Sequence, residues 1–94
     1  MNIDYSRLPE HMREGTRAYI EEGRLPGDFL QAVICNNLAD AVGRADHINK
    51  HLLPEWVLFF YNEVPRGCWG SKDKMRQWIA DRSGALLAAR HREA

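Results

Sequence analysis

Apolar residues recur along most of the chain at intervals of three and four, which is the period of an amphipathic α-helix. The first such segment opens at Leu8-Pro9, where proline suits the first helical turn, and Gly23 is placed to end it. Its apolar stripe consists of Leu8, Met12, Thr16, Tyr19 and Ile20. Gly15 inside this helix weakens it by about 1 kcal/mol, so we expect another segment to approach closely there.

A second apolar pattern follows the Pro26-Gly27 turn, with Asp28 or Gly27 as its N-cap. Its stripe consists of Phe29, Leu30, Val33, Ile34, Leu38, Ala41 and Val42. Asn36-Asn37 interrupts the stripe. Because asparagine side chains compete for backbone hydrogen bonds, the sequence predicts a bend or a break into two short helices there. Gly43 is expected to end or kink the second part.

Residues 46–64 predict a short helical turn that leads into a longer helix, whose first turn accommodates Pro54. We assign the core face of this longer helix to Trp56, Val57, Phe60, Tyr61 and Val64. Leu58 and Phe59 make it apolar almost all round, which is typical of a central helix or of one covered by a partner. Pro65-Arg66-Gly67 ends it.

The last helix is predicted to begin at Ser71, its N-cap, after the loop Cys68-Trp69-Gly70. Its apolar stripe consists of Met75, Trp78 and Ile79. Ser83-Gly84 is expected to terminate or interrupt this helix. The remaining residues then form one or two frayed turns that pack through Leu86 and Leu87.

Taken together, these patterns predict an all-α protein, a compact bundle of four to five short helices. We expect one domain over residues 1–94, with 1–7 and 85–94 as frayed ends. The 45% share of hydrophobic residues is ample for a folded core. The longest apolar runs fall far short of the roughly 20 residues that cross a bilayer, and the N-terminal residues lack the apolar core of a secretory signal. Two cysteines suit reduced thiols, so we expect a cytoplasmic protein with no membrane contact.

The histidines and cysteines offer one arrangement for a metal. His47 and His51 are four residues apart, a spacing that places two imidazoles on one helix face, and Cys35 and Cys68 would complete a tetrahedral site. The spacings are irregular and no C-x-x-C pair is present. We therefore favour surface histidines and free thiols, and we predict no cofactor.

Cys68 is also a candidate nucleophile. It lies near the start of the last helix and close to Arg66, Lys72 and Lys74 in the sequence, a setting that lowers the pKa of a thiol. The chain has no glycine-rich phosphate loop, nucleophile elbow or H-E-x-x-H motif. Ser71 paired with a histidine is the other candidate nucleophile. We interpret Cys68 more simply as a packed loop residue next to Trp69, and we do not expect an enzyme.

The formal charge is zero, but it is unevenly spread. Residues 1–47 hold five Lys and Arg against eight Asp and Glu, whereas residues 48–94 hold eight against five. The basic positions Arg66, Lys72, Lys74 and Arg76 surround Trp69 and form a candidate binding surface. Phosphates favour such helix starts, so a small nucleic-acid-binding protein is the alternative reading. Few phosphate contacts are available, however, and Trp78 and Ile79 resemble core positions more than a recognition helix.

Several polar residues interrupt the apolar segments of the sequence. Arg44, Asp46 and Asn49 are expected to form a buried cluster that holds the middle helices together, with Asn62 capping the exit.

Three tryptophans, three tyrosines and three phenylalanines are many for so small an interior. If Phe59, Leu58 or Trp69 stays outside, it creates an apolar patch with a charged rim, which marks a contact with another protein or with a second copy of the chain. The predicted partner-contact residues are Arg66, Trp69, Lys72, Lys74, Arg76 and Phe59. Glu10, Glu14, Glu21 and Glu22 form the opposite, acidic pole.

Three segments, PEHMREGTRAYIEEG, PGDFLQAVICNNLADAVGRAD and FFYNEVPRGCWGS, resemble a family of short accessory proteins of tailed bacteriophages and prophages. The resemblance covers residues 8–71, and the W-G-S loop after Y-N is its most specific part. It supplies no catalytic residues. It implies a phage product in the host bacterial cytoplasm that docks on a host protein and modulates it, for example as an inhibitor of a defence system such as CRISPR.

Overall fold

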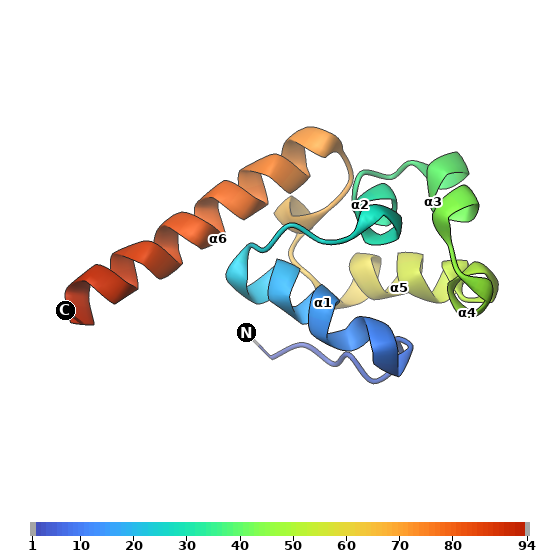
Figure 1. The fold of residues 1–94 in the computed structure, drawn as a ribbon, viewed down its shortest axis with the longest axis horizontal. Helices are drawn as coiled ribbons and strands as arrows, with labels where there is room; N and C mark the ends of the chain where they lie inside the picture. Colours follow the sequence, from blue (N-terminus) through green and yellow to red (C-terminus); the bar gives the residue numbers. More distant parts are fainter. Residues whose placement is uncertain (1, 94) are drawn as a thin grey trace.

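The computed structural model describes the backbone of residues 2–93 and the side chains of residues 2–84. Within that range the chain is all-α, as predicted, and has no strand. It forms α1 (Glu10–Glu22), α2 (Asp28–Ile34), α3 (Leu38–Arg44), α4 (His47–His51), α5 (Leu53–Glu63), the short 3-10 helix η1 (Arg66–Cys68) and α6 (Lys72–Glu93). The described helices outnumber the four to five expected, because the second pattern breaks in two and α4 stands apart from α5. Figure 1 shows α1 to α5 gathered into a bundle from which α6 projects.

The break between α2 and α3 lies at the predicted asparagines. Asn36 adopts the left-handed conformation with φ 61°, and the side chain of Asn37 caps α3 by accepting a backbone N–H at 3.2 Å. This turn redirects the chain, so α3 does not continue the stripe of α2. Only Ala41 of α3 is buried, whereas Leu38 and Val42, which we assigned to the stripe, are exposed.

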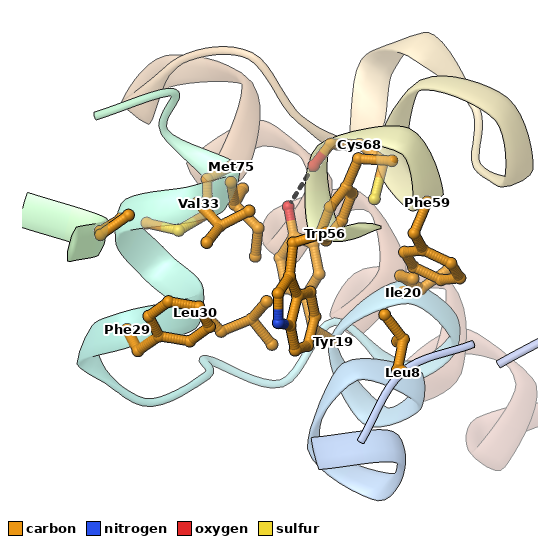
Figure 2. Packing of buried hydrophobic residues seen from close by; sticks show 14 residues of the cluster. Leu8, Tyr19, Ile20, Phe29, Leu30, Val33, Trp56, Phe59, Cys68 and Met75 are labelled. Carbon is orange, nitrogen blue, oxygen red and sulfur yellow. Dashed lines mark hydrogen bonds between the residues drawn. The ribbon is translucent and has the colours of Figure 1, made fainter. Parts of the chain in front are cut away.

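The core lies where α1, α2 and α5 meet, closed from the side by η1 and the start of α6 (Figure 2). At its centre the Trp56 ring is fully buried and meets the edge of Phe29 at 5.6 Å between ring centroids. The apolar stripe of α1 is buried as predicted, except that Met12 is only partly covered. In α6, Met75 is buried, and Trp78 and Ile79 pack against the core from its edge.

The face of α5 that enters the core differs from the prediction. Trp56, Phe59 and Phe60 are buried, whereas Val57 and Tyr61, which we assigned to the core, are 44% and 75% exposed. The assignment fails because α5 is apolar almost all round, so periodicity alone does not choose its inward face.

Gly23 lies at a close approach between the end of α1 and the backbone of α6. It ends α1 as predicted, in the left-handed conformation with φ 71°. A Cβ built on it would lie 2.7 Å from the Cβ of Arg82 and 2.9 Å from the carbonyl oxygen of Ile79. At the same seam the Trp78 indole N–H donates to the carbonyl of the α1 core residue Ile20 at 3.0 Å.

Gly15, where we expected the close approach, is exposed, and a Cβ there would meet nothing within 4 Å. Its neighbours leave open space, so the expectation is wrong for this glycine.

α6 does not stop at Ser83-Gly84, contrary to the prediction, and continues to Glu93. A glycine inside a helix costs about 1 kcal/mol, which the flanking helix-forming residues tolerate, and Ser83 is held by a hydrogen bond from its hydroxyl to the Gly23 carbonyl at 3.2 Å. The predicted packing of Leu86 and Leu87 lies outside the described side chains. The projecting helix gives the molecule a longest dimension of 45 Å (Figure 1).

The segment before α1 is not a loose end. Ile3 and Tyr5 pack against the core, and the Tyr5 hydroxyl donates to the Glu21 carboxylate at 2.7 Å. Tyr5 and Phe59 lie 5.7 Å apart between ring centroids. We expected residues 1–7 to fray, but within the described part, from residue 2 on, these contacts hold the segment on the bundle.

The predicted buried polar cluster is smaller than expected. Asn49 is buried and accepts the Trp56 indole N–H at 3.1 Å, while Asp46 caps α4 by accepting the Asn49 backbone N–H at 2.7 Å. Asp46, Arg44 and Asn62 are all exposed, so Asn49 alone of the four predicted residues is buried. Arg44 instead pairs at 3.1 Å with the carboxylate that opens α2, because it lies at the end of α3 that faces that helix start.

Candidate functional site

The loop between α5 and α6 is tied to the bundle on both sides of Trp69. The Tyr19 hydroxyl, from α1, donates to the Cys68 carbonyl at 2.6 Å (Figure 2, dashed line). On the other side of the tryptophan, the Gly70 backbone N–H donates to the Ile34 carbonyl at the end of α2 at 2.7 Å. Gly70 has φ 120°, a conformation that side chains rarely adopt. The sequence Cys-Trp-Gly therefore forms a fixed bridge between α1 and α2.

Ser71 then starts α6 as predicted, because its hydroxyl accepts the Lys74 backbone N–H at 3.1 Å. This cap sets the direction in which the first residues of α6 point.

Trp69 is half-buried and packs on Phe60, with 5.8 Å between ring centroids. Beside it opens a hollow of about 370 Å³, which is lined by Tyr61, Val64, Arg66, Trp69, Gly70 and Lys74. Three of the residues predicted to contact a partner, Arg66, Trp69 and Lys74, thus lie around one hollow.

Trp69 also lines a second, smaller hollow of about 30 Å³ between α2, α3 and α5. Leu38, Leu53 and Val57 contribute to its walls. Leu38 is 68% exposed, so this part of the surface is open to a ligand.

One side of α5 joins the two hollows. Leu53, Val57, Tyr61 and Val64 follow one another at intervals of four, four and three, which places them on one helix face. We call this face, together with Leu38 and Trp69, the Trp69 surface. Arg66 and Lys74 stand beside its larger hollow, and no carboxylate is among the described residues that line either hollow.

The other predicted contact residues are not on this surface. Lys72 lines a separate cavity of about 230 Å³ together with Cys35, and both Lys72 and Arg76 act electrostatically on that thiol. Positions 72 and 76 are one helical turn apart and share a face of α6, whereas position 74 points elsewhere. Phe59 is only 3% exposed and is enclosed by the core, so its prediction as a contact residue is wrong.

Neither cysteine is an activated nucleophile. Cys68 is fully buried as a free thiol, in agreement with a packed loop residue, and burial raises its pKa to about 12. Burial also raises the pKa of Cys35, against the opposing charges of Lys72 and Arg76. The basic side chains near Cys68 in sequence point to solvent and do not compensate its desolvation.

The predicted metal ligands do not converge. His47 and His51 share one face of α4 as expected, with ring centroids 5.0 Å apart. Cys68, however, is enclosed in the core and Cys35 lies against Met75 of α6, at 3.9 Å between sulfur atoms. In the part of the chain that the structure describes, no three His, Cys, Asp or Glu side chains gather to hold a metal ion.

Most of the predicted acidic pole is engaged internally. Arg17 donates to both Glu14 and Glu22 at 2.6 Å, and Glu21 accepts the Tyr5 hydroxyl. Glu10 is exposed at the start of α1. The strongest candidate surface is therefore the one around Trp69, not the acidic face of α1.

Sequence reasoning missed Tyr61, Val57 and Leu38 as surface residues because each had been assigned to the core. A signal was present: α5 carries more apolar positions than one face can bury, so some of them must point outward.

No helix of the described residues is both long enough and apolar enough to cross a membrane. No protein-family model, curated protein or solved structure matches this chain.

Proposed function

We propose that the protein acts without catalysis, by binding a bacterial host protein and modulating it. The observation that carries the proposal is the Trp69 surface. Leu38, Val57 and Tyr61 are 68%, 44% and 75% exposed and line two hollows that share the half-buried Trp69. Contiguous apolar area with charged neighbours is characteristic of protein contacts, in which buried Tyr, Trp and Arg side chains carry most of the binding energy.

The identity of the partner class comes from the resemblance of residues 8–71 to phage accessory proteins. On that basis the protein is a phage-type product in the bacterial cytoplasm, and a defence system such as CRISPR is a target of the kind that such products inhibit. The most specific motif of this resemblance, Y-N-x-x-P-x-G-C-W-G-S, spans residues 61–71 and so includes the loop that carries Trp69.

Nucleic-acid binding is the second candidate, because Trp69 and Tyr61 beside Arg66 and Lys74 offer aromatic and basic groups of the kind that stack and neutralise single strands. Two points favour protein over nucleic acid. Among the described residues only two cations line the hollows of this surface, and the smaller hollow is lined mainly by aliphatic side chains, with Trp69 as its one aromatic residue.

The test is affinity capture from bacterial lysate followed by mass spectrometry. The test variant Tyr61→Ala/Lys74→Ala changes two exposed residues of the Trp69 surface. Its matched control, Leu25→Ala/Lys72→Ala, changes an exposed leucine (66%) and a lysine outside that surface. We expect the wild type and the control to retain the same host protein and the test variant to lose it, with unchanged helical circular dichroism in all three.

Equal capture by both variants contradicts the assignment of the surface. Retention on DNA or RNA that falls steeply with salt, together with nuclease-sensitive capture, supports the nucleic-acid alternative instead.

A further inference from the structure

We infer that the Trp69 surface receives a peptide segment of the partner that presents aliphatic side chains and, beside them, carboxylates. This inference rests on the proposed function and names the chemistry of what is bound.

The apolar requirement follows from the smaller hollow. Its volume of about 30 Å³ has room for about two water-sized groups, which is the tip of a valine, leucine or isoleucine side chain. Leu38, Val57 and Trp69 offer such a tip apolar contacts on several sides. Apart from Asn36 and Asn37, the residues that line this hollow are apolar, which suits an aliphatic side chain of a peptide better than the polar edge of a base.

The acidic requirement follows from the larger hollow. Arg66 and Lys74 line it, and among the described residues no carboxylate comes within ion-pair distance of either. The charge of this hollow therefore comes from these two cations, since its described lining holds no acidic side chain.

Two cations that border an apolar face without an internal counter-charge are complementary to a ligand that brings its own. A partner that placed Lys or Arg here would meet like charge, so the same two residues also select against basic segments.

A second copy of this chain is a poorer occupant. In a two-fold dimer the same surface contributes both sides, and the described residues that line this surface include no carboxylate to face Arg66 and Lys74.

The probe is a library of random 16-residue peptides displayed on phage particles and selected on the immobilised wild-type protein. We expect the enriched peptides to combine aliphatic residues with an excess of Asp and Glu over Lys and Arg. Tyr61→Ala should weaken the binding of these peptides by about fivefold or more, which is the loss typical of an aromatic contact residue. In a parallel selection on Arg66→Glu/Lys74→Glu, the charge preference should reverse toward basic peptides.

The control Lys72→Glu/Arg76→Glu makes the same change of charge on another face of α6 and should leave the wild-type preference intact. Circular dichroism of all variants checks that each is folded.

Three outcomes overturn the inference. The first is no enrichment over the bare support, or an enriched set without charge bias. The second is that a single-stranded deoxythymidine 20-mer binds the protein with a steep salt dependence and displaces the peptides. The third is a dimer of the wild-type chain in analytical ultracentrifugation that Tyr61→Ala dissociates. If peptides fail but lysate capture still distinguishes the Trp69-surface variant from its control, the proposed function stands and only the peptide chemistry is wrong.

Discussion

Replacing Gly23 by alanine is the sharpest test of how α6 is attached to the bundle. The added methyl group meets two separate obstacles. The residue sits at φ 71°, where a side chain collides with its own backbone. Its Cβ also comes within 2.9 Å of the Ile79 carbonyl oxygen and 3.0 Å of the Ser83 backbone nitrogen. These are backbone atoms of α6, so no side-chain rotation relieves the contact.

The expected loss of stability is the sum of two costs, one for the backbone conformation and one for the steric contact with α6. The left-handed conformation costs an L-residue about 1–2 kcal/mol, and forcing extra atoms into a packed seam costs about 1–3 kcal/mol. We therefore expect Gly23→Ala to lower the free energy of unfolding by about 2–5 kcal/mol, a large part of the roughly 5–15 kcal/mol typical of a small domain.

Gly15→Ala is the matched control, since it makes the same change inside α1, the helix that Gly23 ends. Gly15 lies in the helix interior with nothing within 4 Å of its would-be Cβ. Alanine should therefore stabilise the protein by about 1 kcal/mol through helix propensity. Urea unfolding followed by circular dichroism measures both variants. If Gly23→Ala is neutral or stabilising, the close seam between α1 and α6 is not a feature of the folded protein.

Three further predictions concern the interior. Asn49→Ala leaves the buried indole N–H of Trp56 without its acceptor and should lower the free energy of unfolding in urea by about 1–3 kcal/mol. Asn62→Ala, at an exposed position, should change it by less than about 0.5 kcal/mol. Burial raises the folded-state pKa of Cys68 to near 12, above its ordinary value of 9, so the folded protein keeps this thiol protonated at pH values where the unfolded chain ionises it. The contribution of Cys68 to the free energy of unfolding is therefore complete below pH 9 and is lost as the pH rises toward 12. The resulting loss of unfolding free energy between pH 8 and pH 11 should be about 2–3 kcal/mol in the wild type. Cys68→Ala should lose correspondingly less stability over the same range. Equal losses in the two proteins would contradict the burial of this thiol. A thiol reagent at neutral pH should label the half-exposed Cys35 in the native protein and Cys68 only after denaturant is added, and native labelling of both would contradict the core described above.

The helix boundaries that depend on local chemistry were predictable from the sequence. Gly23 ends α1, the Asn36-Asn37 pair breaks the second pattern and Ser71 caps α6, and each acts through its own backbone preference or side-chain hydrogen bond. The same local reasoning failed at Ser83-Gly84, where a small intrinsic cost does not decide whether a helix continues.

The face of α5 was not predictable, because Val57 and Tyr61 are as suitable for a core as Phe59 and only packing against α1 and α2 selects among them. The candidate site was predicted in part. Trp69 and its basic neighbours were predicted from the uneven distribution of charge along the chain. Residues that are close in the sequence do not all lie on the same surface, however. Lys72 and Lys74 are two residues apart and therefore point to different sides of α6.

The bonds from Tyr19 and Ile34 to the segment around Trp69 have a thermodynamic consequence. Since both sides of this segment are held before any ligand arrives, complex formation has little backbone to order here. Calorimetry should then record a negative heat-capacity change from apolar contact without the large entropic penalty of coupled folding. In the proposed complex we therefore expect this loop to keep its conformation, and any disorder-to-order transition to occur in the partner.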